Sequence, residues 1–287
     1  MRPFATIVVP YELGRLRQGV GCGPEHLVER GAEAALRSRG AGVSTRMVEL
    51  DERFNATGSG DGDAVFELIR LVAAEVRAAR EAGAFPVVLS GSCCLAAVGT
   101  MAGLDEAAPG AVWFDSHADF NEPATAVSGY IDGMGLAILT GGAWQGLLGT
   151  VPGGRPVPEA RVVLAGARDL DPPEATRLRA SQIICVGPDD LRSPGALVAA
   201  VAGIAPQPTG LYVHVDLDVL DAAVAHVNLY NSPGGPDADE LVELVGALLQ
   251  RFPVCGLSLT AYDPSYDTGD RVPQIALRIL RTLAAHL

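Results

Sequence analysis

Seven short apolar runs, rich in β-branched residues, recur along the chain between longer segments of helical periodicity. Continuous apolar runs of this length, bounded by glycine, proline or polar residues, are typical of strands buried on both faces of a parallel sheet. We therefore predict strands at 5–10, 85–90, 111–115, 161–166, 181–186, 210–216 and 254–259.

Two of the intervening segments, 66–83 and 272–287, have apolar residues at the three- and four-residue spacing of amphipathic helices. The alternation of strands and helices predicts an α/β fold, with a three-layer, doubly wound and mostly parallel sheet. The segments 55–62 and 150–160 have the composition of surface loops. Neither separates regions of different composition, so we expect a single domain over 1–287.

The charge of the chain excludes several functions. Its formal net charge is -13, which disfavours nucleic acid and anionic membranes as partners. All 21 basic residues apart from histidine are arginine, so Schiff-base catalysis and a P-loop, which both need a lysine, are excluded. The apolar run at the N-terminus is too short for a signal peptide or a membrane span, and we expect a cytoplasmic protein.

The cysteines are odd in number and contain no CxxC pair, so neither a disulfide framework nor a zinc knuckle is indicated. We expect most of them to be small buried side chains. The five are Cys22, Cys93, Cys94, Cys185 and Cys255.

Two of the predicted strands run directly into the acidic sequences DSHAD and DLD. Alternate side chains of an extended chain share a face, and the carboxyl ends of parallel strands meet at one edge of a sheet. We therefore expect one cluster of side chains from both sequences. Its members are Asp115, His117, Asp119, Asp216 and Asp218.

Carboxylates crowded at one place repel unless a cation neutralises them. Four aspartates and one histidine form a hard, oxygen-dominated ligand set, which suits manganese better than a structural zinc site. The alternative interpretation of DSHAD is a strand end followed by a helix cap. The second acidic sequence at the end of another strand favours the metal site.

The chain resembles the ureohydrolases, a family that includes arginase, agmatinase and proclavaminate amidinohydrolase. The resemblance covers nearly the whole chain, and DFNxP, GYxxGM and RDxD make it nearest to the N-hydroxy-L-arginine amidinohydrolase branch. Six motifs occur in the family's order: VGCGPEHLVERGAEAAL at 20–36, VVLSGSCCLAAVG at 87–99, DSHADFNEP at 115–123, SGYIDG at 128–133, ARDLDPPE at 167–174 and DLDVLD at 216–221.

The resemblance implies one or two manganese ions, or another divalent metal, that share a hydroxide able to attack a guanidinium carbon and release urea or hydroxyurea. It also implies a homo-oligomer, a trimer or a hexamer. One ion would be held by Asp115, Asp119, Asp216 and Cys93, and the other by Asp115, His117, Asp216 and Asp218, with Asp115 and Asp216 as bridges.

Four further positions match the residues that bind the amino-acid part of the substrate in arginase. Asn121 and Ser128 would bind its carboxylate, and Asp171 and Glu174 its amino group. The alternative is that Asp171 and Glu174 cap a helix, because acids in a first turn suit the helix dipole.

Three positions depart from the family pattern. Cys93 replaces a histidine ligand, and it either binds a metal through its thiolate or merely packs. Asp132 replaces a proton-shuttling histidine; with Asp119 it is our catalytic candidate, and the alternative for Asp132 is a turn former. Ala261 replaces a glutamate that binds the guanidinium, which counts against arginine itself as the substrate.

The resulting prediction is a metal-dependent amidinohydrolase that cleaves a guanidino or N-hydroxyguanidino amino acid. One alternative is a catalytically silent protein with the same fold, which the three departures favour. The other is a hydrolase of a different C–N amide or imine bond, because related deacetylases use this fold with one metal.

Overall fold

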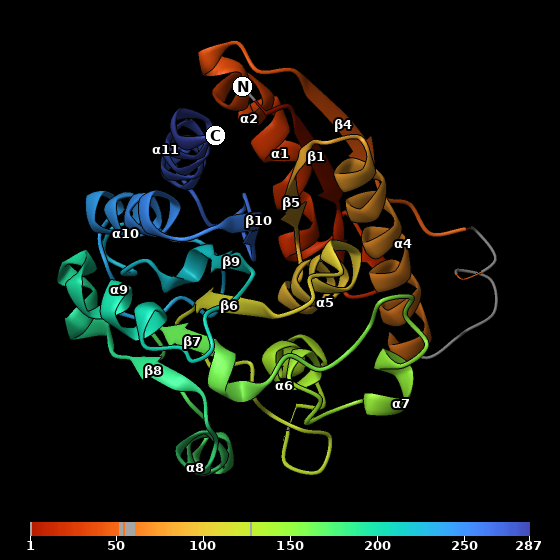
Figure 1. Cartoon of the computed structure of the whole chain (residues 1–287), viewed down its shortest axis with the longest axis vertical. Coiled ribbons are helices and arrows are strands. Elements are labelled where there is room, and N and C mark those ends of the chain that lie inside the picture. The colour runs from red at the N-terminus through yellow and green to blue at the C-terminus, as the bar shows by residue number, and fades with distance from the viewer. Residues whose placement is uncertain (1, 52–53, 55–60, 127) are drawn as a thin grey trace.

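The computed structural model describes residues 2–51, 54, 61–126 and 128–287. Its centre is a sheet of eight strands in the order β4-β1-β5-β10-β9-β6-β7-β8, and every neighbouring pair is parallel (Figure 1). In that order the strands are Val43–Met47, Phe4–Val9, Phe85–Ser90, Val254–Thr260, Gly210–Asp216, Pro109–Phe114, Val162–Ala165 and Ile184–Val186. A hairpin of β2 (Tyr11–Glu12) and β3 (Arg15–Leu16) forms a separate small sheet.

Helices cover both faces of the large sheet, and each face has its own hydrophobic core. Adjacent residues of one strand serve opposite cores: Trp113 belongs to one and Phe114 to the other. The first layer comprises α4 (Asp61–Glu81), α5 (Cys93–Leu104), α6 (Gly135–Leu139) and α7 (Gln145–Leu148). The second comprises α1 (Gly23–Glu29), α2 (Ala32–Leu36), α9 (Pro194–Ala202), α10 (Ala238–Arg251) and α11 (Arg271–His286).

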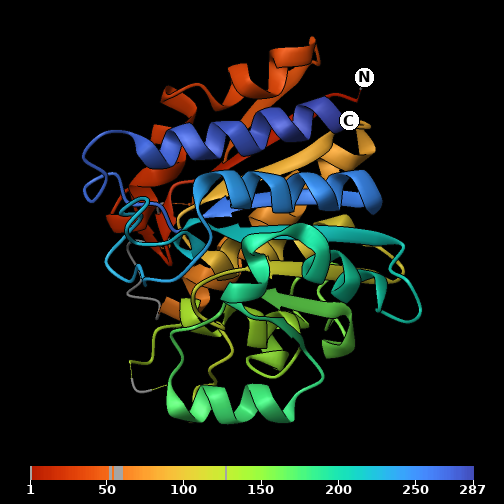
Figure 2. The ribbon, with the colours of Figure 1, turned by 90° about the vertical axis from the view of Figure 1, so that its left-hand side faces the viewer.

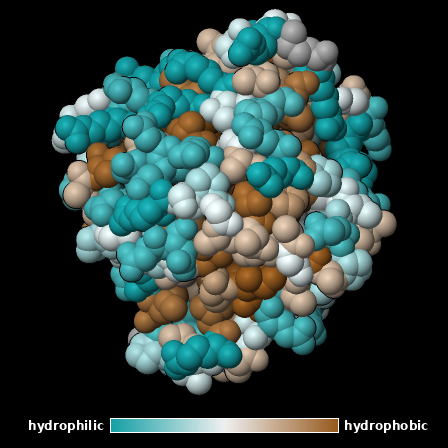
Figure 3. All heavy atoms as spheres, turned by 60° about the vertical axis from the view of Figure 1, so that its left-hand side comes forward, coloured by the Kyte–Doolittle hydropathy of each residue, from teal (hydrophilic) through white to brown (hydrophobic). Residues whose placement is uncertain are grey.

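Figure 2 shows α10 and α11 lying next to one another on the second face, while α8 (Pro172–Ala180) lies at the far end of the molecule, beyond β8. On the α9 side of the surface, hydrophobic side chains gather in the lower half of the view in Figure 3. Within the described residues, no helix is both long enough and apolar enough to cross a membrane. The 3-10 helices are η1 (Gly19–Cys22), η2 (Arg37–Arg39), η3 (Asp132–Met134), η4 (Glu159–Arg161), η5 (Pro188–Arg192) and η6 (Leu217–Val219).

The predicted three-layer α/β fold is confirmed, and all seven predicted strands are present. The strand β4 was not predicted, because it lies at the sheet edge with its side chains half-buried or exposed, so its sequence VSTRM has no apolar run. The helix α4 begins at Asp61, so residues 61–62 are helical and not part of a loop; residues 55–60 lie outside the described residues.

Most cysteines were expected to be buried, and this is wrong for the set as a whole. Cys93 and Cys94 are buried, but Cys22 and Cys255 are only half-buried and Cys185 is exposed. All five are free thiols. Cys185 is exposed because it lies on β8, an edge strand with one side open to solvent.

The register of the parallel strands determines which residues are level with one another at the carboxyl edge of the sheet. In the pair of β6 with β9, Phe114 lies opposite Val215, so the next residues, Asp115 and Asp216, are level with each other. Asp216 is in turn paired with Thr260 of β10. The carboxyl ends of β5, β10, β9 and β6 therefore meet at one edge of the sheet.

Gly91, in the connection from β5 to α5, is predicted to be essential for close packing at this edge. A Cβ atom there would collide with the carbonyl oxygen of Tyr11 and lie 2.8 Å from the Cα of Gly21. We expect Gly91→Ala to lower the free energy of unfolding by about 1–3 kcal/mol, measured by urea denaturation. Gly146→Ala, in α7 with no atom within 4 Å of its Cβ, is the control and should not destabilise. Equal stability of both variants would contradict the packing argument.

Candidate metal centre

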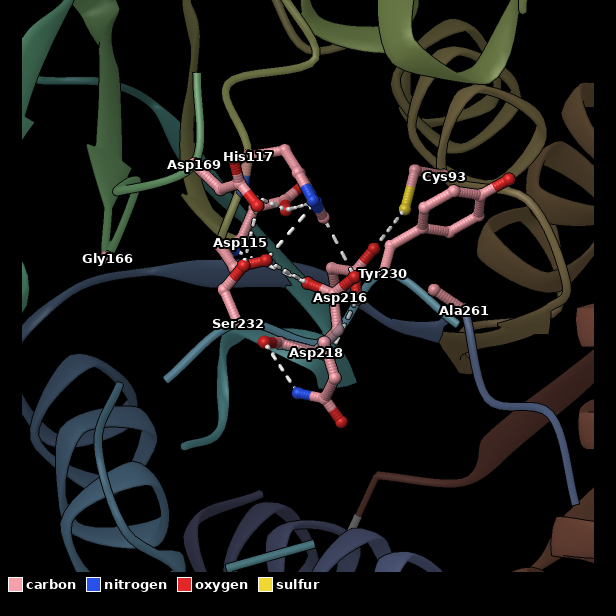
Figure 4. A network of polar contacts seen from close by, with 12 residues as sticks. Cys93, Asp115, His117, Gly166, Asp169, Asp216, Asp218, Tyr230, Ser232 and Ala261 are labelled. Carbon is pink, nitrogen blue, oxygen red and sulfur yellow. Dashed lines mark hydrogen bonds and ion pairs between the residues drawn. The ribbon is translucent and has the colours of Figure 1, made fainter. Parts of the chain in front are cut away.

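The centre is built at the ends of β6 and β9 and at the start of α5 (Figure 4). Asp115 directly follows β6, Asp216 is the last residue of β9, and Asp218 lies in η6. Cys93 is the first residue of α5, on the connection that follows β5. The structure thus brings together side chains that are up to 125 residues apart in sequence (93 to 218).

One group of potential ligands consists of Asp115, His117 and Asp218, whose ligand atoms all lie within 4.8 Å of one another. The Nδ1 atom of His117 lies 3.3 Å from Asp115 Oδ1 and 3.5 Å from Asp218 Oδ2. The two aspartates are buried, whereas the histidine is partly exposed.

A second group consists of Cys93, Asp115 and Asp216, again with all ligand atoms within 4.8 Å. The Cys93 thiol donates to Asp216 Oδ2 at 3.0 Å and lies 3.1 Å from Thr260 Oγ1. All three members are buried. Because Asp115 belongs to both groups, the two groups overlap as the sites of a bridged pair of ions would.

The electrostatics of the two groups fit a divalent cation. Burial raises the pKa of Asp115 and of Asp216, and the neighbouring charge of Asp218 raises both further. Burial lowers the pKa of His117, but its hydrogen bond to Asp115 and the charges of Asp218 and Asp115 outweigh this and raise the pKa to about 9. Buried carboxylates that destabilise one another in this way are stabilised by a metal ion.

Neighbouring donors fix the orientation of the carboxylates, as outer residues do around protein-bound metals. Trp113 Nε1 donates to Asp115 Oδ2 at 2.9 Å, and Ser116 Oγ donates to Asp218 Oδ1 at 2.9 Å. Asn228 Nδ2 donates to Asp218 Oδ2 at 3.2 Å. None of Trp113, Ser116 and Asn228 was predicted from the sequence; Ser116 follows Asp115 and Trp113 lies two residues before it, but no pattern singles out Asn228.

Three buried polar side chains, Thr260, His214 and Ser258, form a series of hydrogen bonds that begins at Cys93. Thr260 Oγ1 is 3.4 Å from His214 Nε2, and His214 Nδ1 is 2.9 Å from Ser258 Oγ. Burial lowers the pKa of His214 to about 3, so this histidine is neutral. No function was predicted for His214 from the sequence; its position two residues before Asp216, on the same face of β9, was the only signal.

A cavity of about 460 Å³ adjoins the centre, and its lining includes Cys93, His117, Asp216 and Asp218. Asp119 also lines this cavity, but among the described residues neither group of ligand atoms within 4.8 Å includes it. Its backbone is in the left-handed region at φ 49°, and its carbonyl oxygen accepts from Leu136 and Ala137 at the start of α6. Burial raises the pKa of Asp119, and the charges of Asp115 and other carboxylates raise it further.

Asp132 connects the cavity to the helix that carries Cys93. Its Oδ1 atom accepts from the backbone N–H of Cys94 at 2.8 Å, in the first turn of α5. Burial raises the pKa of Asp132 to about 6, although hydrogen bonds from the backbone N–H groups of Cys94 and Cys93 act to lower it. The residue begins η3, as a turn former would, but its buried carboxylate also lines the cavity.

The four predicted substrate-binding residues all line this cavity of about 460 Å³. Asn121 Nδ2 donates to Asp171 Oδ2 at 3.3 Å, and Glu174 Oε1 accepts from Phe120 N–H at 2.8 Å. Ser128 Oγ accepts from the N–H of Tyr130 at 3.2 Å. Asp171 is the N-cap residue of α8, but its side chain makes no capping hydrogen bond; Glu174 lies in the first turn, where the alternative interpretation places it.

The fold and the site together define an α/β protein with a carboxylate-rich candidate metal centre at the carboxyl edge of its parallel sheet. The model of the Arginase family matches residues 2–285, and the chain belongs to this family.

Individual relatives agree with this assignment. The arginase of Brevibacillus brevis is 33% identical over 228 residues, which cover 76% of each chain. That of Eremothecium gossypii is 30% identical over 236 residues, which cover 76% of this chain and 58% of the relative. The solved arginase structure from Bacillus caldovelox superimposes with a TM-score of 0.87 at 26% identity, covering 99% of this chain and 98% of that chain.

Asp115 is predicted to control metal binding, because both groups share it. Without metal, Asp115→Asn should raise the melting temperature, since it removes one of several crowded carboxylates. With metal at about 100 times the dissociation constant, the wild type should gain about 2.7 kcal/mol of stability, and the variant should lose most of that gain. Calorimetry with and without manganese tests this, with the exposed Asp189→Asn as control. A full metal-induced gain in Asp115→Asn would contradict the shared-ligand arrangement.

Proposed function

We propose that this protein is a metal-dependent amidinohydrolase that cleaves a guanidino or N-hydroxyguanidino amino acid and releases urea or hydroxyurea. The observation that carries the proposal is the pair of overlapping ligand groups that share Asp115 and whose other members line an acidic cavity. Membership of the Arginase family supports the reaction class. We treat residues 1–287 as one catalytic domain.

In this proposal one metal would be held by Asp115, His117 and Asp218, and another by Cys93, Asp115 and Asp216, with Asp119 as an additional ligand. The oxygen-rich set favours manganese. When bound, such ions lower the pKa of water and so supply a nucleophile at neutral pH.

The remaining residues orient the substrate and handle its protons. Asp132 holds a proton on the carboxylate oxygen that does not accept from Cys94, and passes it to the leaving nitrogen; a pKa of about 6 suits this exchange near neutral pH. Asp171 and Glu174 bind the amino group of the substrate, while Asn121 and Ser128 orient its carboxylate. Burial of the cavity floor keeps bulk water away from the reacting carbon.

A homo-oligomer, a trimer or a hexamer, is part of the same proposal. It rests on the resemblance of the chain to the ureohydrolases. The cytoplasmic location expected from the sequence stays a prediction.

Release of urea or hydroxyurea is the direct test of this function. We expect the manganese-loaded protein to release one of them from at least one member of a panel of arginine, N-hydroxyarginine, agmatine and guanidinobutyrate. Colorimetric detection of both products, with chelator-treated protein as control, makes the measurement. Bound metal without turnover of any member would favour a catalytically silent protein, and turnover of another amide or imine alone would favour the third hypothesis.

Cys93→Ser tests the thiol as a ligand. Serine keeps a hydrogen bond donor for Asp216 and Thr260 but replaces a sulfur ligand with a poorly ionising hydroxyl. We expect the variant to lose one metal per chain, or about tenfold or more in affinity at that site, measured by elemental analysis and metal titration. Cys94→Ser, at the adjacent buried cysteine, is the control. Unchanged stoichiometry and affinity in Cys93→Ser would show that the thiol only packs.

A further inference from the structure

Tyr230 is an exposed aromatic residue at the rim of the catalytic cavity. Its side chain is 56% exposed, although most large apolar side chains of this protein are buried. It lines the same cavity as His117 and Ala261, and its ring meets that of His117 edge to face, with centroids 6.4 Å apart at an interplanar angle of 85°. An open ring beside a cavity is available to contact a ligand.

The backbone that carries this ring is held firmly by Asn228. The buried Asn228 side chain accepts from the N–H of Tyr230 at 2.8 Å through Oδ1. Through Nδ2 it donates to the carbonyl of Ala261 at 2.8 Å and to Asp218 at 3.2 Å. In Figure 4 the Tyr230 ring lies on the Cys93 and Ala261 side of the centre. The backbone that carries the ring is therefore fixed relative to a candidate metal ligand, while the ring itself is open to solvent.

The charge of the cavity indicates what the ring contacts. The described residues that line the cavity include seven carboxylates and no arginine, so a cationic ligand is favoured over a neutral one. On the Tyr230 side, Ala261 contributes only a methyl group, while the carboxylates of Asp216 and Asp218 already belong to the ligand groups. The negative face of an aromatic ring attracts a planar cation without adding another charge.

We propose that Tyr230 recognises the guanidinium end of the substrate through its ring face, and that this contact selects guanidino compounds over neutral ureido compounds of the same shape. This inference rests on the proposed function and names the residue that sets its selectivity. Asn228 acts as a positioning residue, because it fixes the Tyr230 backbone to Asp218 and Ala261.

The test compares substitutions that keep or remove the aromatic ring. For the panel compound with the highest turnover, Tyr230→Leu should raise KM about 2- to 30-fold, the range of a cation–π contact, with kcat within about twofold because this contact binds ground state and transition state alike. Tyr230→Phe should keep the KM of the wild type. The inhibition constant of the ureido analogue of that compound should be the same in all three proteins. Tyr266→Leu, at an exposed tyrosine outside the cavity lining, is the matched control.

Metal content and melting temperature of each variant show whether the fold and the centre are intact. A KM that is unchanged in Tyr230→Leu, or a loss that is equal for the guanidino compound and its ureido analogue, overturns the role of Tyr230 while the proposed function stands. A KM in Tyr230→Phe as high as in Tyr230→Leu also overturns it, since the hydroxyl would then be the recognition element. A metal-loaded wild type that turns over none of the panel overturns both proposals.

Discussion

The arrangement of this protein depends on one constraint: the parallel pairing of β6 with β9 forces Asp115 and Asp216 to the same level at the end of two central strands. Both carboxylates are buried, and Asp218 adds a third at close range. Such crowding is unfavourable without a cation, because the charges repel one another and none is well solvated. The donors from Trp113 and Ser116 compensate only part of this cost.

The two ligand groups differ in chemistry, although they share Asp115. Both groups contribute side chains to the cavity lining, but only the His117 group has a partly exposed member, and its other two members and all three of the Cys93 group are buried. Burial and the surrounding carboxylates raise the pKa of the Cys93 thiol well above its ordinary value, and the thiol must lose its proton to bind a metal. His117, whose pKa is raised to about 9, must likewise lose a proton to bind a metal, so metal binding at either group would release protons.

Backbone strain accumulates at the same cavity. Asp119 and Ala261 both adopt the left-handed conformation, at φ 49° and 64°, which costs about 1–3 kcal/mol for residues with a side chain. Each is held by its carbonyl oxygen: that of Asp119 accepts from the first turn of α6, and that of Ala261 accepts from Asn228. The hydrogen bonds that maintain the strain therefore also position the cavity walls.

Three features could be predicted from the amino-acid sequence alone: the layer architecture, seven of the eight strands of the large sheet, and the acidic sequences at the ends of β6 and β9. These features are local, because periodicity along the chain decides which residues are buried and where each strand ends. The sequence did not determine β4, whose polar residues lie at the sheet edge. Nor did it reveal Asn228 or His214, whose partners lie in other segments. The order of strands brings those segments together, and only packing of the complete sheet decides that order. Among the described residues Asp119 lies outside both ligand groups, and neither this nor its left-handed backbone could be predicted from the DSHAD sequence, because both depend on the packed loop around it.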